Sequence, residues 1–285
     1  MQTLYVAGEV RTPSVPLATA MLVSDGLVEW LGPVAEAPSS ERRVDLGDAL
    51  VTPAFVDAHV HSTDTGLARL GLDVSKVRSK QELLEAVAAF AQTGEGVVLG
   101  HGFDESTWGN EQTPPSSAEL DRAAGGRSVY LSQASIHSAL VSSDLLALAA
   151  GSPGYDPSGW VRQGAHHVVR EAAFGRITPT QRAAAQQSAL EGAAALGIAA
   201  VHECGGPGTS SEDDFTGLLK RSGSDGLPEV YGYWGELMGA AKARDLGAVG
   251  AGGDLYADGA LGSRTAHVRE SYLDAAGCGN AYITA

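Results

Sequence analysis

The sequence contains few cysteines, few basic residues and no long hydrophobic run, and each shortage excludes a class of protein. Two cysteines, Cys204 and Cys278, are too few for a disulfide framework, so we expect a reducing, cytoplasmic location. The 34 acidic residues outnumber the 19 basic ones, for a net charge of −15. Nucleic acids and anionic membranes require a basic surface, so neither is expected as a partner. No apolar run reaches membrane-spanning length, and the N-terminus has no signal-peptide pattern.

The remaining composition is that of an ordinary globular protein, with 44% hydrophobic and 19% charged residues. The 285 residues suffice for one large or two modest domains with a buried core. Asp25 and Gly26 separate two apolar runs and predict a hairpin turn. Helical spacing or helix-start signals predict helices over three ranges, and strands alternate with helical stretches after residue 196. The helices are expected at 80–90, 142–150 and 178–196.

Two histidines end a short apolar run over residues 51–61. His59 and His61 are two residues apart, so on a strand their side chains point to the same side, with Val60 turned the other way. Two converging imidazoles suit a divalent metal such as zinc. We therefore predict that His59 and His61 are metal ligands. The alternative is a pair of structural histidines at a strand end.

Three segments resemble one known family. Residues 52–61, Thr-Pro-Ala-Phe-Val-Asp-Ala-His-Val-His, are similar to the first-strand signature of the amidohydrolase superfamily, with Ala54 where that family prefers Gly. Residues 256–266 and 100–108 resemble the N-substituted formamide deformylase-like branch, amidohydrolase family 3. The resemblance extends over nearly the whole chain.

The resemblance implies an α/β fold, the TIM-like (β/α)8 barrel of metal-dependent hydrolases, here incomplete. We expect residues 1–50 to form the N-terminal part of a composite β-sandwich and 51–285 to form the incomplete barrel. Residues 65–195 are then a large α/β insertion after the first barrel strand. An independent N-terminal hairpin cap is the alternative for residues 1–50.

On this assignment three further barrel strands follow the insertion, at 198–203, 229–234 and 254–258. A plain count of apolar runs instead gives six strands, by including 97–103 and 129–133. A (β/α)8 barrel closes with eight strands. We therefore expect a C-terminally truncated chain, with the family's later metal histidines and its catalytic aspartate, the general base, beyond residue 285.

The family's fourth strand usually carries a carboxylated lysine that bridges two metal ions, four residues before an Asp-Gly pair. The corresponding residue here is Asp254, so a lysine-bridged pair of ions is in doubt. Asp254 or Glu203 is expected to supply a carboxylate ligand instead. His202 is a weaker candidate, and Cys204 is interpreted as buried core.

Substrate contacts are expected from polar residues of the insertion and of the loop after the last predicted strand, because barrel active sites lie at the carboxyl ends of strands. The candidates are His101, Asp104, Trp108, His137, Asp258 and Arg264. Asp258 and Arg264 either orient a substrate or fix their loop. His166 and His167 are adjacent and are not expected to share a metal.

The predicted function is metal-dependent hydrolysis of a non-peptide C–N bond in a small molecule, such as an amide or N-substituted formamide, with one or two divalent ions, preferably zinc. The resemblance supplies the substrate class, whereas the residues themselves indicate only metal-assisted hydrolysis. Two alternatives stay open: a catalytically inactive fragment that acts as a binding or assembly module, and one half of a split enzyme completed by a separate C-terminal half. Homo-oligomerisation is a further possibility.

Overall fold

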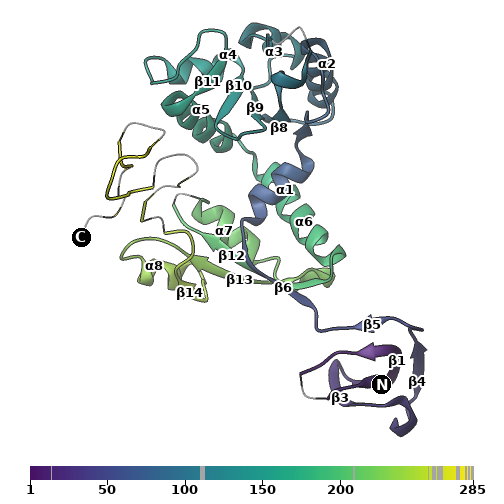
Figure 1. Cartoon of the computed structure of the whole chain (residues 1–285). Coiled ribbons are helices and arrows are strands. Elements are labelled where there is room, and N and C mark those ends of the chain that lie inside the picture. The colour runs from purple at the N-terminus through teal and green to yellow at the C-terminus, as the bar shows by residue number, and fades with distance from the viewer. Residues whose placement is uncertain are drawn as a thin grey trace. The chain divides into compact units, whose positions relative to one another are not determined.

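The computed structural model describes residues 1–285 except 14, 110–112, 208, 256, 259–260, 262–265, 274–276, 280, 282 and 284–285. The chain divides into two compact units, Met1–Val56 and Asp57–Ala285, whose elements are labelled in Figure 1. None of the helices in the described ranges is long and apolar enough to cross a membrane.

The first unit is built on a mixed sheet in which β1 is central, antiparallel to β2 and parallel to both β4 and β5. Its strands are β1 (Gln2–Val10), β2 (Ala18–Ser24), β3 (Leu27–Gly32), β4 (Arg42–Asp45) and β5 (Leu50–Val51). The turn predicted at Asp25 and Gly26 is confirmed, because both residues have positive φ between the antiparallel strands β2 and β3. Leu4, Ala20 and Leu22 form part of the core of this unit.

The predicted insertion contains a sheet of its own, ordered β11-β10-β9-β8-β7. Its strands are β7 (Leu72–Asp73), β8 (Val98–Phe103), β9 (Val129–Gln133), β10 (Ser138–Val141) and β11 (Trp160–Arg162). Its helices are α2 (Lys80–Ala91), α3 (Ser117–Ala123), α4 (Ser143–Leu146) and α5 (Gln163–Gly175). The strands expected at 97–103 and 129–133 therefore exist, but they pair in a sheet separate from β12 and β13.

Alternation along β9 places helices on both faces of this sheet. Val129 and Leu131 pack in a cluster with Leu83 of α2, whereas Tyr130 packs in a second cluster with Val169 of α5. A strand buried on both faces is the arrangement expected for the parallel part of an α/β sheet.

The third sheet is ordered β14-β13-β12-β6, with β12, β13 and β14 parallel. Its strands are β6 (Phe55–Val60), β12 (Ile198–Gly205), β13 (Glu229–Trp234) and β14 (Gly250–Ala251). The helices that accompany it are α6 (Pro179–Ala195), α7 (Glu212–Leu219) and α8 (Ala240–Asp245). The strand predicted at 254–258 is wrong for the described residues of that range, none of which belongs to a strand: β14 ends at Ala251, where the positive φ of Gly252 and Gly253 follows.

Helix α1 (Ser62–Leu70) leaves β6 and lies against α6, which leads back to β12 (Figure 1). Gly66 makes the close approach possible, since a Cβ atom added there would lie 1.8 Å from the backbone oxygen of Ala185. On the helix-covered face of the third sheet, Val201 and Val230 pack against Leu190 and Leu218. The opposite face carries the side chains of the candidate site.

Candidate metal centre

The two histidines lie where β6 ends and α1 begins. Val60 packs against the apolar cluster beneath α6 and α7, so the neighbouring positions 59 and 61 are directed to the other side of the sheet. His61 is the N-cap residue of α1, and its imidazole ring lies 5.4 Å from that of His59, nearly perpendicular to it. The backbone N–H of His59 donates to Asp57 Oδ1 at 3.1 Å, which fixes the end of the strand.

Asp254 connects the two imidazoles. Its Oδ1 lies 2.9 Å from His59 Nε2 and its Oδ2 lies 2.7 Å from His61 Nε2, and its side chain is only 11% exposed. Asp254 follows β14 after two glycines, and a Cβ atom at Gly253 would lie 3.4 Å from the Cα atom of Cys204. The positive φ of Gly252 and Gly253 is what calls for glycine at these two positions, and the turn they make leads to Asp254 at the histidines.

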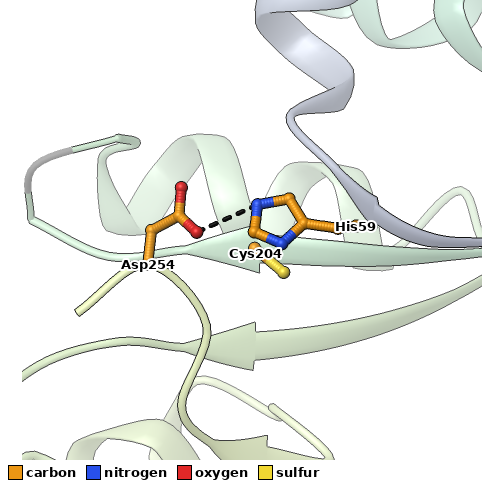
Figure 2. A group of neighbouring side chains, drawn as sticks. All are labelled: His59, Cys204 and Asp254. Carbon is orange, nitrogen blue, oxygen red and sulfur yellow. Dashed lines mark ion pairs between the residues drawn. The ribbon is translucent and has the colours of Figure 1, made fainter. Parts of the chain in front are cut away.

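Cys204 adds a sulfur donor close to His59 and Asp254 (Figure 2). The ligand atoms of His59, Cys204 and Asp254 all lie within 4.8 Å of one another, the one such group of three found among the described residues. Burial, and then the carboxylate of Asp254, raise the pKa of the Cys204 thiol. The sequence analysis interpreted Cys204 as buried core. It is indeed buried, but alternation along β12 puts it on the face opposite Val201, and only the packing of Val201 against the helices shows that this is the face of His59.

Glu203 does not join this group. Val201, two residues earlier on β12, faces the helices, and strand alternation directs Glu203 to that same buried side. Its carboxylate accepts a hydrogen bond from the backbone N–H of Ser62 at 2.8 Å, and burial raises the pKa of Glu203 to about 7. The structure thus gives Glu203 a partner at the start of α1 rather than the histidines, while His202 lies between the rings of Tyr231 and Tyr233.

Two of the predicted substrate contacts line a cavity of about 670 Å³ in the second unit. His101 extends from β8, and its Nε2 lies 3.0 Å from the carbonyl oxygen of Ala68 in α1. His137 follows the turn between β9 and β10 and is exposed to the same cavity. The structure therefore brings these two histidines together at one cavity.

Asp104 and Trp108 have structural roles in the described residues. Asp104 caps a short 3-10 helix, with Oδ1 accepting from the N–H and the hydroxyl group of Ser106. Trp108 was expected at the mouth of the pocket, but it is 4% exposed and packs in the hydrophobic core with Phe103 and Val74. The indole therefore packs inside the hydrophobic core and does not line the mouth of the pocket, which corrects the prediction for Trp108.

The loop after Asp254 contains the last two candidates. Asp258 Oδ2 accepts a hydrogen bond from the backbone N–H of His267 at 2.8 Å, and residue 258 forms an isolated bridge with Ala281. These contacts join residue 258 to His267 and Ala281, and a substrate contact of Asp258 stays a prediction. Arg264 lies outside the described residues.

The donor set fits a divalent metal ion of the zinc type. Imidazole nitrogen, carboxylate oxygen and cysteine sulfur are the three protein donors that zinc uses, and here they converge from β6, β12 and the segment after β14. The two Nε2 atoms already point at one carboxylate, so the imidazoles are oriented before any ion binds.

Comparison with known proteins also points to a hydrolase family. A family model described as "Amidohydrolase family" matches residues 42–284. "Putative amidohydrolase YtcJ" of Bacillus subtilis (strain 168) is 27% identical over 299 residues, covering 93% of this chain and 54% of the relative. "Protein LONG AFTER FAR-RED 3" of Arabidopsis thaliana is 25% identical over 301 residues, covering 92% of this chain and 50% of the relative.

The fold is shared with a crystal structure of an uncharacterized metal-dependent hydrolase from Pyrococcus furiosus. The TM-score is 0.76 at 24% identity, and the alignment covers 99% of this chain and 62% of that one. The chain spans about half the length of the two curated relatives. Because the family model matches well over half of its residues, the chain belongs to the amidohydrolase family.

Proposed function

We propose that this chain provides the metal centre of a metal-dependent hydrolase that cleaves non-peptide C–N bonds, of the amide or N-substituted formamide type. The observation that carries the proposal is the convergence of His59 and His61 on the carboxylate of Asp254. Membership of the amidohydrolase family supports metal-dependent hydrolysis as the reaction type. The finer substrate class comes from the resemblance of residues 100–108 and 256–266 to the formamide deformylase-like branch.

The residues that would hold the ion are His59, His61 and Asp254, with Cys204 beside them. A zinc ion in such a site lowers the pKa of water and polarises a carbonyl group. Asp254 takes the position where the family has a bridging lysine, and its side chain is too short to span two ions as a carboxylated lysine does. The donor set therefore favours one ion.

The chain's own groups prepare this site. Both Nε2 atoms face the one carboxylate of Asp254, that of His59 at Oδ1 and that of His61 at Oδ2, while the backbone N–H of His59 donates to Asp57. The burial of Asp254 at 11% side-chain exposure limits access of water to its carboxylate, which strengthens its electrostatic interaction with a cation.

The first test measures metal content. The purified chain is dialysed against EDTA, reloaded with zinc, desalted and analysed for elements, beside the double variant His59→Ala/His61→Ala. The matched control is His137→Ala/His167→Ala, which removes the same number of imidazoles from exposed positions outside the donor group. We expect about one zinc per chain in the wild type and the control, and none in the first variant.

Asp254→Asn tests the contribution of the carboxylate to zinc binding separately from that of the histidines. The amide has the same shape but carries no charge and is not among the usual zinc ligands, so we expect zinc affinity to fall by more than the roughly 10–100-fold typical of groups that only orient metal-bound histidines. Equal zinc content in the wild type and His59→Ala/His61→Ala would refute the proposed centre.

Turnover is tested with N-benzylformamide and water, which give benzylamine and formic acid, measured as amine release. Turnover that requires zinc and is lost in His59→Ala/His61→Ala supports hydrolysis at this centre. Zinc retention with no turnover across a panel of amides and formamides refutes hydrolysis by this chain, and supports instead an inactive binding module or a subunit of a split enzyme.

A further inference from the structure

A cavity of about 670 Å³ lies among α1, β8, β9 and α5, in the part of the chain that the sequence predicted as an insertion. Its volume is within the range typical of small-molecule sites, roughly 300–1,000 Å³. Leu67, Leu99, Ile136 and Phe174 give it apolar walls from four separate segments. An apolar body of a ligand would therefore be enclosed from several sides.

The cavity carries one pair of opposite charges. Arg170 Nη2 lies 3.7 Å from Asp64 Oδ2, and the guanidinium group also lies 4.5 Å from the centre of the Phe174 ring. At this distance the two groups neutralise each other without a short hydrogen bond, so donor and acceptor atoms remain for a ligand. The pair places a hydrogen-bond donor directly beside an acceptor.

The deeper wall is uncharged at neutral pH. Tyr130 Oη lies 2.8 Å from His166 Nε2, and both residues are buried. Burial raises the pKa of Tyr130 to about 12 and lowers the pKa of His166 to about 4, so the phenol and the imidazole are both neutral at pH 7. A ligand with a net charge would find no uncompensated opposite charge on these groups.

Two non-glycine residues with positive φ lie at the rim of this cavity. Ile136 has φ of 60° and Gln163 has φ of 48°, and both line the cavity. A β-branched residue at positive φ is a genuine outlier, and such strain is found mostly at ligand-binding and catalytic positions. The turn from Gln133 to Ile136 fixes this conformation through a backbone hydrogen bond of 2.8 Å, and the Ile136 side chain remains 70% exposed. The strain thus holds an apolar side chain open to solvent at the cavity mouth.

We infer that this cavity binds a small neutral aromatic carboxamide, with the ring against the apolar walls and the amide against Asp64 and Arg170. An amide offers an acceptor oxygen beside a donor N–H, which is the complement of the Asp64–Arg170 pair. Ile136 covers the ring at the mouth. The inference concerns binding and holds whether or not the proposed hydrolysis takes place.

The test is a titration of the EDTA-treated, metal-free chain with 2-naphthamide, followed by ligand fluorescence and by calorimetry. The isosteric anion 2-naphthoate is the charge control. Ile136→Asn removes the apolar side chain and tolerates positive φ, so its fold should be preserved. Leu17→Asn is the matched control: Leu17 has φ of 63° and is 87% exposed, but it belongs to the first unit and does not line the cavity.

We expect saturable binding of 2-naphthamide, weakened about tenfold by Ile136→Asn, or about 1.4 kcal/mol, and unchanged by Leu17→Asn. Ala68→Trp, which places an indole in the cavity from α1, should abolish binding. Binding of 2-naphthoate should be at least about tenfold weaker than that of the amide, since its carboxylate at Arg170 would lie beside the like charge of Asp64. Absence of saturable binding to the folded wild type, equal binding by Ile136→Asn, or equal affinity for the two ligands would overturn the inference. Each result is independent of zinc content, so it is distinguishable from failure of the metal centre.

Discussion

Replacement of Gly66 by alanine tests the contact between α1 and α6, the two helices that join the candidate site to the separate sheet of β7–β11. The position is helical and buried, and a Cβ atom there would lie 1.8 Å from the backbone oxygen of Ala185. Carbon and oxygen atoms approach no closer than roughly 3.3 Å, so the helices must separate by about 1.5 Å. A gap of that size removes a large part of the dispersion energy across the interface.

The magnitude follows from two opposing effects. Alanine in a helix is more favourable than glycine by about 1 kcal/mol, whereas overpacking typically costs about 1–3 kcal/mol and occasionally more; with backbone at 1.8 Å we take the cost to be about 3–4 kcal/mol. We expect Gly66→Ala to lower the free energy of unfolding by about 2–3 kcal/mol. The assay is urea unfolding of the metal-free chain, followed by circular dichroism.

Two other helical glycines serve as matched controls. At Gly217 the nearest atom to an added Cβ is Gln186 Oε1 at 3.6 Å, an ordinary contact, so Gly217→Ala should stabilise the chain by about 0.5–1 kcal/mol. At Gly192 the obstacle is the guanidinium group of Arg69, the end of a flexible side chain that can move, so the effect should be small. If Gly66→Ala is as stable as Gly217→Ala, the close approach of α1 and α6 is refuted.

Three further substitutions address capping and protonation. Thr178→Ala removes the capping box at the start of α6 and should lower the free energy of unfolding by about 1 kcal/mol in urea melts, whereas an unchanged midpoint would contradict the role of the cap. The pKa of Glu203 is raised by burial to about 7, so its ionisation opposes folding as pH rises from about 4.5 to 7. In metal-free buffer the free energy of unfolding of Glu203→Gln should therefore equal that of the wild type at pH 4 and exceed it at pH 8 by up to about 3 kcal/mol. Parallel pH profiles of the two proteins would show the reasoning to be wrong. The pKa of Glu119 is lowered to about 2, first by Lys80 and then by Ser116, so its stabilising effect is complete above about pH 4.5 and disappears as pH falls toward 2. Glu119→Gln should therefore lose less free energy of unfolding than the wild type between pH 4.5 and 2, by only a few tenths of a kcal/mol because the pair is near the surface. The same loss in both proteins would exclude this contribution.

Local signals in the sequence predicted much of the secondary structure. The Thr178-Pro179 start and the apolar spacing of 80–90 correctly predicted α6 and α2, because caps and helical periodicity depend on neighbouring residues alone. Helix α5 was not predicted, although Ala165, Val169 and Ala173 are buried at four-residue spacing along it. Its alanines are weakly hydrophobic, which makes the pattern faint without the sheet that covers it.

The composition of the candidate site was predicted in part. His59, His61 and Asp254 were proposed as ligands from the motif, and the structure places their donor atoms in contact. The choice between Glu203 and Asp254 as the carboxylate ligand stayed open, because it depended on which face of β12 the helices cover, a tertiary fact that alternation within one strand cannot supply. Asp254 lies after the strand rather than inside it, because the length of β14 is set by pairing with β13.

The separation of the sheets also has a kinetic meaning. The β7–β11 sheet has two apolar clusters built from its own residues, and its contacts are between segments near one another in the chain. The metal-binding edge instead requires contacts such as that between Ser62 and Glu203, 141 residues apart. Long loops close slowly and at a larger entropic cost. We therefore expect the inserted sheet to form early and to shorten the effective loop between β6 and β12, so that the donors of the metal centre assemble last; pulse-labelled hydrogen exchange in which the β12 amides are protected before those of β8 and β9 would contradict this order.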